Sequence, residues 1–367
     1  MNFGIVHETR LNEKRVALTP NGSAVLIRAG HKVYLESGAG LACGWTDQHY
    51  ENQGVQVIFS HEEIYGRADV LLKILPVVAK NLQYILEGQT IISFQHLTVS
   101  SPEVYFGLLE KKVNVIGMEL IEGDDGTRPI LTAMSEIAGQ LAPIIAGNYL
   151  GRDPMGKGVL LGGVAGVAPA SVVILGAGTS GLNAACAFSG LGAQVHILDR
   201  DLNKLREVRR HLGNHVTTLF ADQNNIIKSL KFADVFLGAV LIHGRRTPNI
   251  LKREQIAQMK PLSIFIDFSI DEGGISETSR PTTLADPIYI EEGVIHYCVP
   301  NITAGVNRTA SRALANILVD QLRTIGQLGV KAALEQNANL RRGTYLLDGV
   351  CLIPELIEHF KDRKSSR

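Results

Sequence analysis

The chain has 367 residues, of which 45% are hydrophobic and 20% are charged. This length favours two domains, and the composition is that of an ordinary soluble globular protein. Because Lys plus Arg and Asp plus Glu each number 36, the formal net charge is zero, and no basic field is available for nucleic acid or an acidic membrane surface. Met1 leads straight into an apolar run rather than into a signal peptide, so we expect a cytoplasmic location.

Short apolar runs that alternate with helical stretches predict two series of β-strands. The first series lies at residues 3–6, 31–37, 55–59, 69–74, 90–94 and 114–119. The second series lies at residues 171–175, 194–198, 216–220, 234–240, 263–269 and 294–299. Such alternation predicts parallel sheets covered by helices on both faces. We therefore expect an α/β fold with two doubly wound domains.

Two long helices are predicted at the borders of the second strand series. Apolar residues recur at helical spacing over residues 131–150 and again over 307–336. A long helix on each side of the second domain indicates two crossing connections, after which the C-terminal segment completes the first domain. The predicted boundaries are therefore 1–130 plus 306–367 for a discontinuous first domain and 131–305 for the second.

One stretch has the composition of a membrane span. From residue 158 to residue 198 there are 41 residues without Asp, Glu, Lys or Arg. Glycines and Pro169 interrupt the stretch, however, and apolar strands stand near both of its ends. It therefore predicts a buried strand–turn–helix–strand unit rather than a transmembrane helix.

A glycine-rich turn in this stretch predicts a dinucleotide site. The turn reads Gly176, Ala177, Gly178, Thr179, Ser180, Gly181. It follows an apolar strand, opens a helix and precedes a second strand that ends in an acid, which is the context of a Rossmann-like fold. The first glycine permits the tight turn, the second lets the backbone approach a pyrophosphate at the helix N-terminus, and the third lets helix and strand pack closely. We therefore assign nucleotide binding to residues 131–305.

Asp199, at the end of the second strand, bears on the choice of nucleotide. Its carboxylate can accept hydrogen bonds from a ribose 2′-hydroxyl and would repel a 2′-phosphate, which favours NAD over NADP. The alternative is that Asp199 caps a helix over residues 201–212.

Polar residues just past the predicted strand ends are the candidates for chemistry, because ligands of doubly wound domains bind at the carboxyl ends of strands. They are Arg15, Lys73, His96, Asp271 and Asn301. Two cations suit a small carboxylate, and a histidine can exchange protons near neutral pH. Taken singly, Lys73 could extend from a strand end into solvent and His96 could be structural. The argument for a site depends on their shared position.

Segments along nearly the whole chain resemble the alanine dehydrogenase and NAD(P) transhydrogenase alpha-subunit family. They are ETRLNEKRVALTP, HKVYLESGAG, DVLLKI, FQHL, MSEIAGQLAP, GVLLGGVAGVAPASVVILGAG, GAVLIHGRRTP, SETSRPTT, and HYCVPNI followed by RTAS. The resemblance implies a reversible oxidative deamination of L-alanine to pyruvate and ammonia, with NAD as cofactor. It also implies that the first domain binds the substrate.

The resemblance implies roles for individual residues. Arg15 and Lys73 hold the substrate carboxylate and carbonyl, His96 is the acid/base group, and Asp271 is the second catalytic residue. In the charged segment 7–20, Arg15 is then the working member and the other charges are solvated. The implied cofactor contacts are Ser135, Gly178 to Gly181, Asp199, Lys204, Val240, Val299, Asn301 and Ile302.

Several residues depart from the family pattern. Phe94 stands where a Tyr is frequent, and Gln140 stands where an Arg is frequent. Glu272 replaces the common Gln, and Pro300 replaces an Ala. The segment KILP lacks the charged pair that usually follows Lys73. These changes leave open whether alanine or another small amino or oxo acid is preferred. A soluble transhydrogenase-like subunit and a non-catalytic NAD-binding protein are the other readings. The family tends to form homo-hexamers, with dimers in some members, and no metal site is expected.

Overall fold

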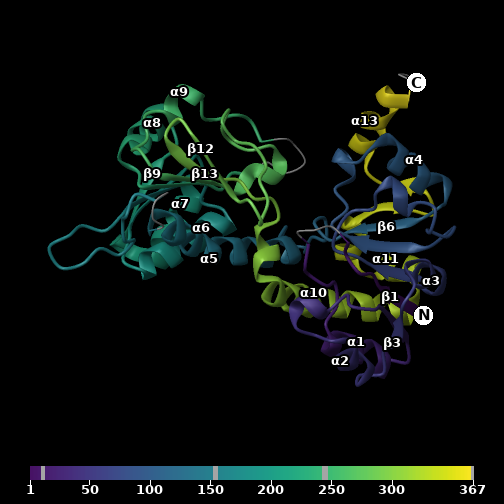
Figure 1. Cartoon of the computed structure of the whole chain (residues 1–367). Coiled ribbons are helices and arrows are strands. Elements are labelled where there is room, and N and C mark those ends of the chain that lie inside the picture. Colours follow the sequence, from purple (N-terminus) through teal and green to yellow (C-terminus); the bar gives the residue numbers. More distant parts are fainter. Residues whose placement is uncertain (10–12, 152–155, 242–246, 365–367) are drawn as a thin grey trace. The chain divides into compact units, whose positions relative to one another are not determined.

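The computed structural model describes residues 1–9, 13–151, 156–241 and 247–364 (Figure 1). They form two compact α/β units, which we call unit 1 (residues 1–134 and 304–367) and unit 2 (residues 135–303). The chain enters unit 2 within helix α5 (Pro129–Gly151) and returns to unit 1 at the short 3-10 helix η6 (Ile302–Val306). The predicted fold class of two α/β domains, the first of them discontinuous, is confirmed.

Unit 1 contains an eight-stranded sheet in the order β15-β14-β6-β5-β4-β1-β2-β3. The strands β1 to β6 run parallel to their neighbours, whereas β14 and β15 add an antiparallel edge next to β6. Their bounds are β1 (Asn2–Ile5), β2 (Lys32–Glu36), β3 (Gln56–Ile58), β4 (Val70–Leu72), β5 (Thr90–Ser93), β6 (Asn114–Gly117), β14 (Thr344–Leu347) and β15 (Val350–Cys351). The C-terminal segment thus completes the first sheet.

Helices cover this sheet, and local signals in the sequence set where several of them begin. Thr19 caps the helix that begins at Pro20, because its side chain accepts a hydrogen bond from the Gly22 amide. Ser101 caps the helix that begins at Pro102 in the same way. One face carries α3, α4 and α13 over a common apolar core. The helices are α1 (Pro20–Arg28), α2 (Asp47–Glu51), α3 (His61–Arg67), α4 (Pro102–Glu110), α10 (Asn307–Leu328), α11 (Val330–Gln336), α12 (Ala338–Arg342) and α13 (Pro354–Lys364).

Unit 2 contains a seven-stranded sheet in the order β12-β13-β11-β10-β7-β8-β9. All of its pairs are parallel except β12 with β13. The bounds are β7 (Ser171–Leu175), β8 (Gln194–Asp199), β9 (Val216–Phe220), β10 (Val235–Gly238), β11 (Ile264–Asp267), β12 (Ile288–Glu291) and β13 (Val294–Tyr297). The order reverses at β7, where a doubly wound sheet opens a crevice for a ligand.

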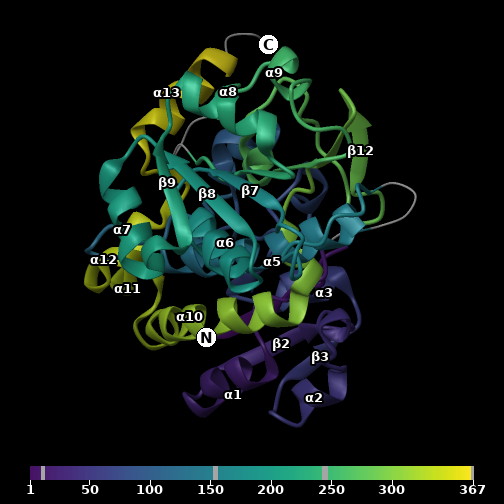
Figure 2. The same cartoon turned by 90° about the vertical axis from the view of Figure 1, so that its left-hand side faces the viewer.

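The two faces of this second sheet are buried by different helices (Figures 1 and 2). Val172 and Ile174 of β7 pack in one core with α5 and α6 (Thr179–Gly190), while Val173 and Leu175 pack in another with α8 (Gln223–Phe232). The remaining helices are α7 (Leu202–Leu212) on the α6 side and α9 (Arg253–Ile256) on the α8 side. Because both faces are covered, the strands are apolar on both sides, as the sequence predicts.

The structure corrects two expectations about these elements. The helix predicted over residues 307–336 is broken, because Gly329 has a φ of +78° and separates α10 from α11. The antiparallel strands β12, β14 and β15 were not predicted, since they are short and lie at sheet edges. The prediction for the uncharged stretch 158–198 is confirmed, because it contains β7, α6 and most of β8.

Of the described helices, α5 alone has the length and apolar composition to cross a bilayer, and 44% of its most apolar part is buried in the structure. Ala138, Ala142 and Ala146 of this helix lie in the core of unit 2. These contacts are those of a core helix in a globular domain.

Candidate functional site

In unit 1, the candidate substrate residues follow three neighbouring strands. Lys73 directly follows β4, His96 lies three residues beyond β5, and Arg15 lies on the connection that leaves β1. The sheet order is β5-β4-β1, and the three strands are parallel, so these connections leave the same edge of the sheet. The shared position predicted from the sequence is therefore present.

Arg15 is buried and is held by a carboxylate from its own loop. Its Nε donates to Glu13 Oε1 at 2.8 Å and its Nη2 donates to Glu13 Oε2 at 2.6 Å. The Arg15 backbone amide also donates to Oε1, at 3.0 Å. The side chains of both residues are only 3% exposed, so Glu13 neutralises a cation that is almost fully removed from water.

Lys73 has a similar partner that is remote in sequence. Its Nζ lies 3.3 Å and 3.4 Å from the two carboxylate oxygens of Glu8, and both side chains are 5% exposed. Glu8 Oε1 also accepts the backbone amides of Ile74 at 2.6 Å and Leu75 at 3.0 Å. Lys73 therefore does not extend into solvent. The expectation that the charges around Arg15 are solvated is wrong for Glu8 and Glu13, because each neutralises a buried cation.

Helix α10, from the C-terminal segment, supports the Arg15 loop. The Ser311 hydroxyl accepts the Val16 backbone amide at 2.9 Å and lies 3.3 Å from the Cys43 thiol. Asn307 donates to the Ala42 carbonyl at 2.6 Å. The loop is thus held between the first strand and a helix almost 300 residues later in the chain. Residues 10–12 of the charged segment lie outside the described part.

His96 has an unusual backbone conformation, with φ 44° and ψ 50°. This left-handed region is uncommon for residues other than glycine, so surrounding contacts must stabilise it. The buried Glu119 carboxylate provides them: it accepts the His96 amide at 2.8 Å, the Gln95 amide at 3.2 Å and the Tyr345 hydroxyl at 2.8 Å. Tyr345 belongs to β14, so the C-terminal segment also supports the candidate acid/base residue.

Phe94 connects the three candidates of unit 1. Its ring stacks on the His96 ring with 6.4 Å between centroids, and the Arg15 Cζ lies 5.7 Å from its centre. The Phe94 amide donates to the Ile74 carbonyl, next to Lys73, at 3.1 Å. Arg15 and His96 therefore lie near one aromatic ring, and the backbone of that aromatic residue is hydrogen-bonded to the residue that follows Lys73.

In unit 2, the glycine-rich turn has the geometry that a pyrophosphate requires. Gly176 has a φ of +107°, and a Cβ there would collide with the Ala239 carbonyl. A Cβ on Gly181 would collide with the Gly176 carbonyl, which shows how closely helix and strand approach. At Gly178 a Cβ would meet nothing, and no side chain in the described part of the protein caps the start of α6. The first amides of α6 thus have no capping side chain among the described residues, and uncapped amides at a helix N-terminus suit an anionic group.

Asp199 is tied to this turn and is not the cap of the next helix. Its Oδ2 accepts the Ala177 amide at 2.7 Å and its Oδ1 accepts the Asp201 amide at 2.8 Å. Asp201 itself caps α7 by accepting the Asn203 amide at 2.8 Å. The alternative role for Asp199 is therefore wrong. Lys204, predicted nearby as a cofactor contact, lies exposed on the first turn of α7.

The other candidates of unit 2 follow β10, β11 and β13. Asp271 is exposed on the 3-10 helix η5 (Phe268–Glu272), and its carboxylate accepts the Asn301 amide at 3.2 Å and 3.3 Å. Asn301 has a φ of +50° and stands between the buried Val299 and Ile302. The Ser269 hydroxyl accepts a hydrogen bond from the Val240 amide and donates one to the Val240 carbonyl. Residues 242–246, in the GAVLIHGRRTP segment, lie outside the described part.

Ser135 lies on α5, one turn before Gly139. Gly139 contacts α6 so closely that a Cβ would lie 2.7 Å from the Ser180 carbonyl. Helix α5 is thus fixed against the helix that follows the glycine-rich turn.

Comparisons with known proteins agree with this arrangement. Residues 4–138 match the model of the alanine dehydrogenase/PNT N-terminal domain, and residues 142–354 match that of the C-terminal domain. The chain belongs to the alanine dehydrogenase/PNT family. It is 40% identical to an alanine dehydrogenase of Methanococcus maripaludis over 350 residues, which cover 95% of this chain and 94% of the relative. It is 38% identical to that of Geobacillus stearothermophilus, with 95% and 94% covered.

Solved structures agree with this family assignment. An L-alanine dehydrogenase superposes with a TM-score of 0.93 and 34% identity, covering 99% of both chains. A transhydrogenase from Sinorhizobium meliloti superposes with a TM-score of 0.82 over 96% of this chain and all of that chain; at 24% identity it shows the shared fold alone.

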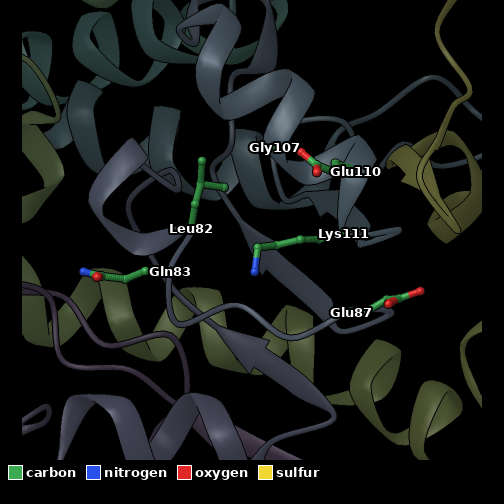
Figure 3. Close-up of a pocket in the computed structure, with 6 residues that line it drawn as sticks. All are labelled: Leu82, Gln83, Glu87, Gly107, Glu110 and Lys111. Atoms are coloured by element: carbon green, nitrogen blue, oxygen red, sulfur yellow. The ribbon is translucent and has the colours of Figure 1, made fainter.

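A surface pocket of about 550 Å³ lies elsewhere in unit 1 (Figure 3). It is lined by Leu82, Gln83, Glu87, Gly107, Glu110 and Lys111, and none of the candidate residues contributes to it. Within the described ranges, no group of three or more His, Cys, Asp or Glu side chains is placed to hold a metal ion.

Sequence reasoning missed the residues that hold the candidates in place. They are Glu8, Glu13, Glu119, Asp267 and Ser311. Glu13 and Arg15 are two residues apart, so the sequence could have indicated that this acid pairs with the proposed anion-binding arginine. The Glu8–Lys73 and Glu119–His96 contacts join residues that are 65 and 23 positions apart, and no local pattern indicates them.

Proposed function

We propose that this chain is an NAD-dependent L-alanine dehydrogenase that interconverts L-alanine with pyruvate and ammonia. The observation that carries the proposal is that Arg15, Lys73 and His96 follow neighbouring parallel strands, with Phe94 beside Arg15 and His96, in a chain whose relatives are alanine dehydrogenases. A small oxo acid has an anionic carboxylate and a polar carbonyl, and these residues offer a partner for each.

In this proposal the Arg15 guanidinium binds the substrate carboxylate, and the Lys73 ammonium polarises the carbonyl without a covalent bond. Glu13 and Glu8 fix the two cations before substrate arrives, which lowers the cost of ordering them on binding. Ammonia then adds to the carbonyl carbon. His96 donates a proton as water leaves. Asp271 is the second proposed catalytic residue.

The nucleotide belongs to unit 2 in this proposal. Backbone amides of Thr179 and Ser180 would bind the pyrophosphate beside Gly178, and Asp199 would bind the ribose. A bound nicotinamide supplies or accepts the hydride. The Ala177 and Asp201 amides hold the Asp199 carboxylate beside the glycine-rich turn, where its negative charge would repel a 2′-phosphate. NAD is therefore the proposed cofactor rather than NADP.

The remaining proposed contacts to the nucleotide are Ser135, Gly176, Gly181, Lys204, Val240, Val299, Asn301 and Ile302. We place the substrate/catalytic domain at residues 1–130 plus 306–367 and the NAD-binding domain at residues 131–305. We further propose a cytoplasmic homo-oligomer, a hexamer or a dimer. Exposed apolar side chains of Ile144, Leu160, Val164 and Val167, each more than 60% exposed, offer unit 2 a surface for assembly. Sedimentation equilibrium would measure the state.

The test is NADH oxidation by the purified chain with ammonium and pyruvate, run beside 2-oxobutyrate, glyoxylate and a reaction without ammonium. We expect turnover with pyruvate that requires ammonium and is much weaker with NADPH. Faster turnover with another oxo acid would keep the reaction type and change the substrate. No turnover despite NADH binding would favour a transhydrogenase-like or non-catalytic protein, and transfer from NADH to a second nucleotide would separate these two.

A further inference from the structure

We propose that Asp267 is a positioning residue that fixes both the Asp271 carboxylate and the Val240 peptide in unit 2. The inference deepens the proposed function and rests on it, since it concerns the same site. Asp267 is the last residue of β11 and is only 1% exposed, so it cannot contact the substrate itself.

The Asp267 carboxylate binds both ends of the loop that carries Asp271. Its Oδ1 accepts the Ser269 amide at 2.9 Å, and its Oδ2 accepts the Ile275 amide at 2.9 Å. The Ser279 hydroxyl donates a third hydrogen bond to Oδ2 at 2.6 Å. Asp271 lies between these two contacts in the sequence, two residues after Ser269 and four residues before Ile275. The carboxylate therefore sets the distance between the two ends.

The loop backbone is shaped to admit this carboxylate. Gly274 has a φ of +79°, and a Cβ at that position would lie 2.9 Å from Asp267 Oδ2. Any larger residue would both strain the backbone and push against the carboxylate. The absence of a side chain at Gly274 thus leaves room for the Asp267 carboxylate and for the Ser279 side chain.

The same carboxylate acts on the nucleotide side through Ser269. With its amide held by Asp267, Ser269 donates its hydroxyl to the Val240 carbonyl at 2.7 Å and accepts the Val240 amide at 3.1 Å. Val240 follows β10 and lies beside Ala239, whose carbonyl touches the Gly176 turn. One buried acid therefore links the candidate catalytic loop to the candidate cofactor loop.

An acid suits this place better than an amide. All three partners donate, and a carboxylate only accepts, so both of its oxygens are satisfied. An asparagine would turn its NH2 group toward one of these donors and release that end of the loop. Burial raises the pKa of Asp267, while the three hydrogen bonds act in the opposite direction.

The test compares Asp267→Asn with three other variants and the wild type. The readouts are kcat of ammonium-dependent NADH oxidation, the Kd for NADH from fluorescence, and Tm. Ser269→Ala loses only the Val240 contacts. Ser279→Ala loses one of the three donors to the Asp267 carboxylate. Asp234→Asn removes another buried carboxylate of unit 2, which accepts the Ser171 amide at 2.9 Å and binds Lys157 and Lys260, far in sequence from the loop.

For Asp267→Asn we expect kcat to fall about 10- to 100-fold and NADH to bind several-fold more weakly, because misplacement by about 1 Å is enough for losses of this size. Ser269→Ala should weaken NADH binding. Asp234→Asn should lower Tm and change neither kcat nor the Kd for NADH.

Asp267→Asn that lowers Tm but leaves kcat and the Kd for NADH at wild-type values would overturn the inference. If that variant does not fold, Ser279→Ala decides, since it should lower kcat in the same direction by a smaller amount. An inactive wild type would instead count against the proposed function. The link to Val240 is then read from the NADH Kd of Asp267→Asn alone, and an unchanged Kd would reject it.

Discussion

The loops of the two units are held by carboxylates, but in two different ways. In unit 1, Glu13 and Glu8 neutralise the buried cations Arg15 and Lys73. In unit 2, Asp199 and Asp267 accept backbone amides instead. The first arrangement holds two buried cationic side chains in place, whereas the second fixes the backbone shape of the loops proposed to bind the nucleotide. Substitutions should therefore change charge balance in unit 1 and loop geometry in unit 2.

The largest expected effect comes from breaking the Lys73–Glu8 pair. Lys73→Met should reduce turnover by a factor of about 1000 or more, since it removes the group that polarises the carbonyl. It should also cost about 3–5 kcal/mol of unfolding free energy, because Glu8 is left as a buried, unpaired charge. Urea denaturation and the NADH assay measure the two losses.

The double variant Lys73→Met with Glu8→Gln sharpens this result. A glutamine oxygen can still accept the Ile74 and Leu75 amides, so stability should largely return while turnover stays absent. If the double variant is as unstable as the single one, charge neutralisation does not describe unit 1.

His96→Asn should give the next largest loss. Removing a general acid/base typically lowers turnover by about 100- to 10000-fold. Asparagine tolerates left-handed backbone better than most residues, and the His96 amide can still donate to Glu119, so Tm should change little. His96→Ala is the matched control, with the same loss of turnover and a lower Tm from strain. Wild-type turnover in either variant would remove the proton-transfer role.

Asp199→Ala tests the backbone arrangement of unit 2. NAD should bind about tenfold more weakly and the preference over NADP should shrink, because the variant lacks both the ribose acceptor and the charge that repels a 2′-phosphate. Asp201→Ala is the control: it removes the cap of α7, which costs about 1 kcal/mol, but leaves the glycine-rich turn intact. Coenzyme titrations of both variants decide, and an unchanged preference in Asp199→Ala would contradict the assignment.

The sequence predicted what local patterns determine. Parallel strands are continuous apolar runs, and the glycine-rich turn has a fixed spacing, so the central strands and the turn at Gly176 are confirmed. The contacts that hold the candidates depend on distant residues. Nothing near Lys73 indicates Glu8, and nothing near His96 indicates Tyr345, which reaches Glu119 from a strand more than 200 residues later. The roles of the site residues stay predictions.

Phe94→Tyr should have the smallest effect and tests how far the charged cluster of unit 1 tolerates change. Phe94 is half-buried and lies near both the Arg15 guanidinium and the His96 ring, so it contributes contact area and a weak cation–π interaction. A tyrosine keeps the ring, and the interaction is worth about 1 kcal/mol or less, so kcat/KM for pyruvate should stay within about threefold.

The informative measurement is the ratio of kcat/KM for 2-oxobutyrate to that for pyruvate. An unchanged ratio would place substrate selection in the paired cations and their carboxylates. A ratio that changes more than tenfold would make the ring at position 94 a determinant of substrate size, and the description of unit 1 as a purely charged site would then be incomplete.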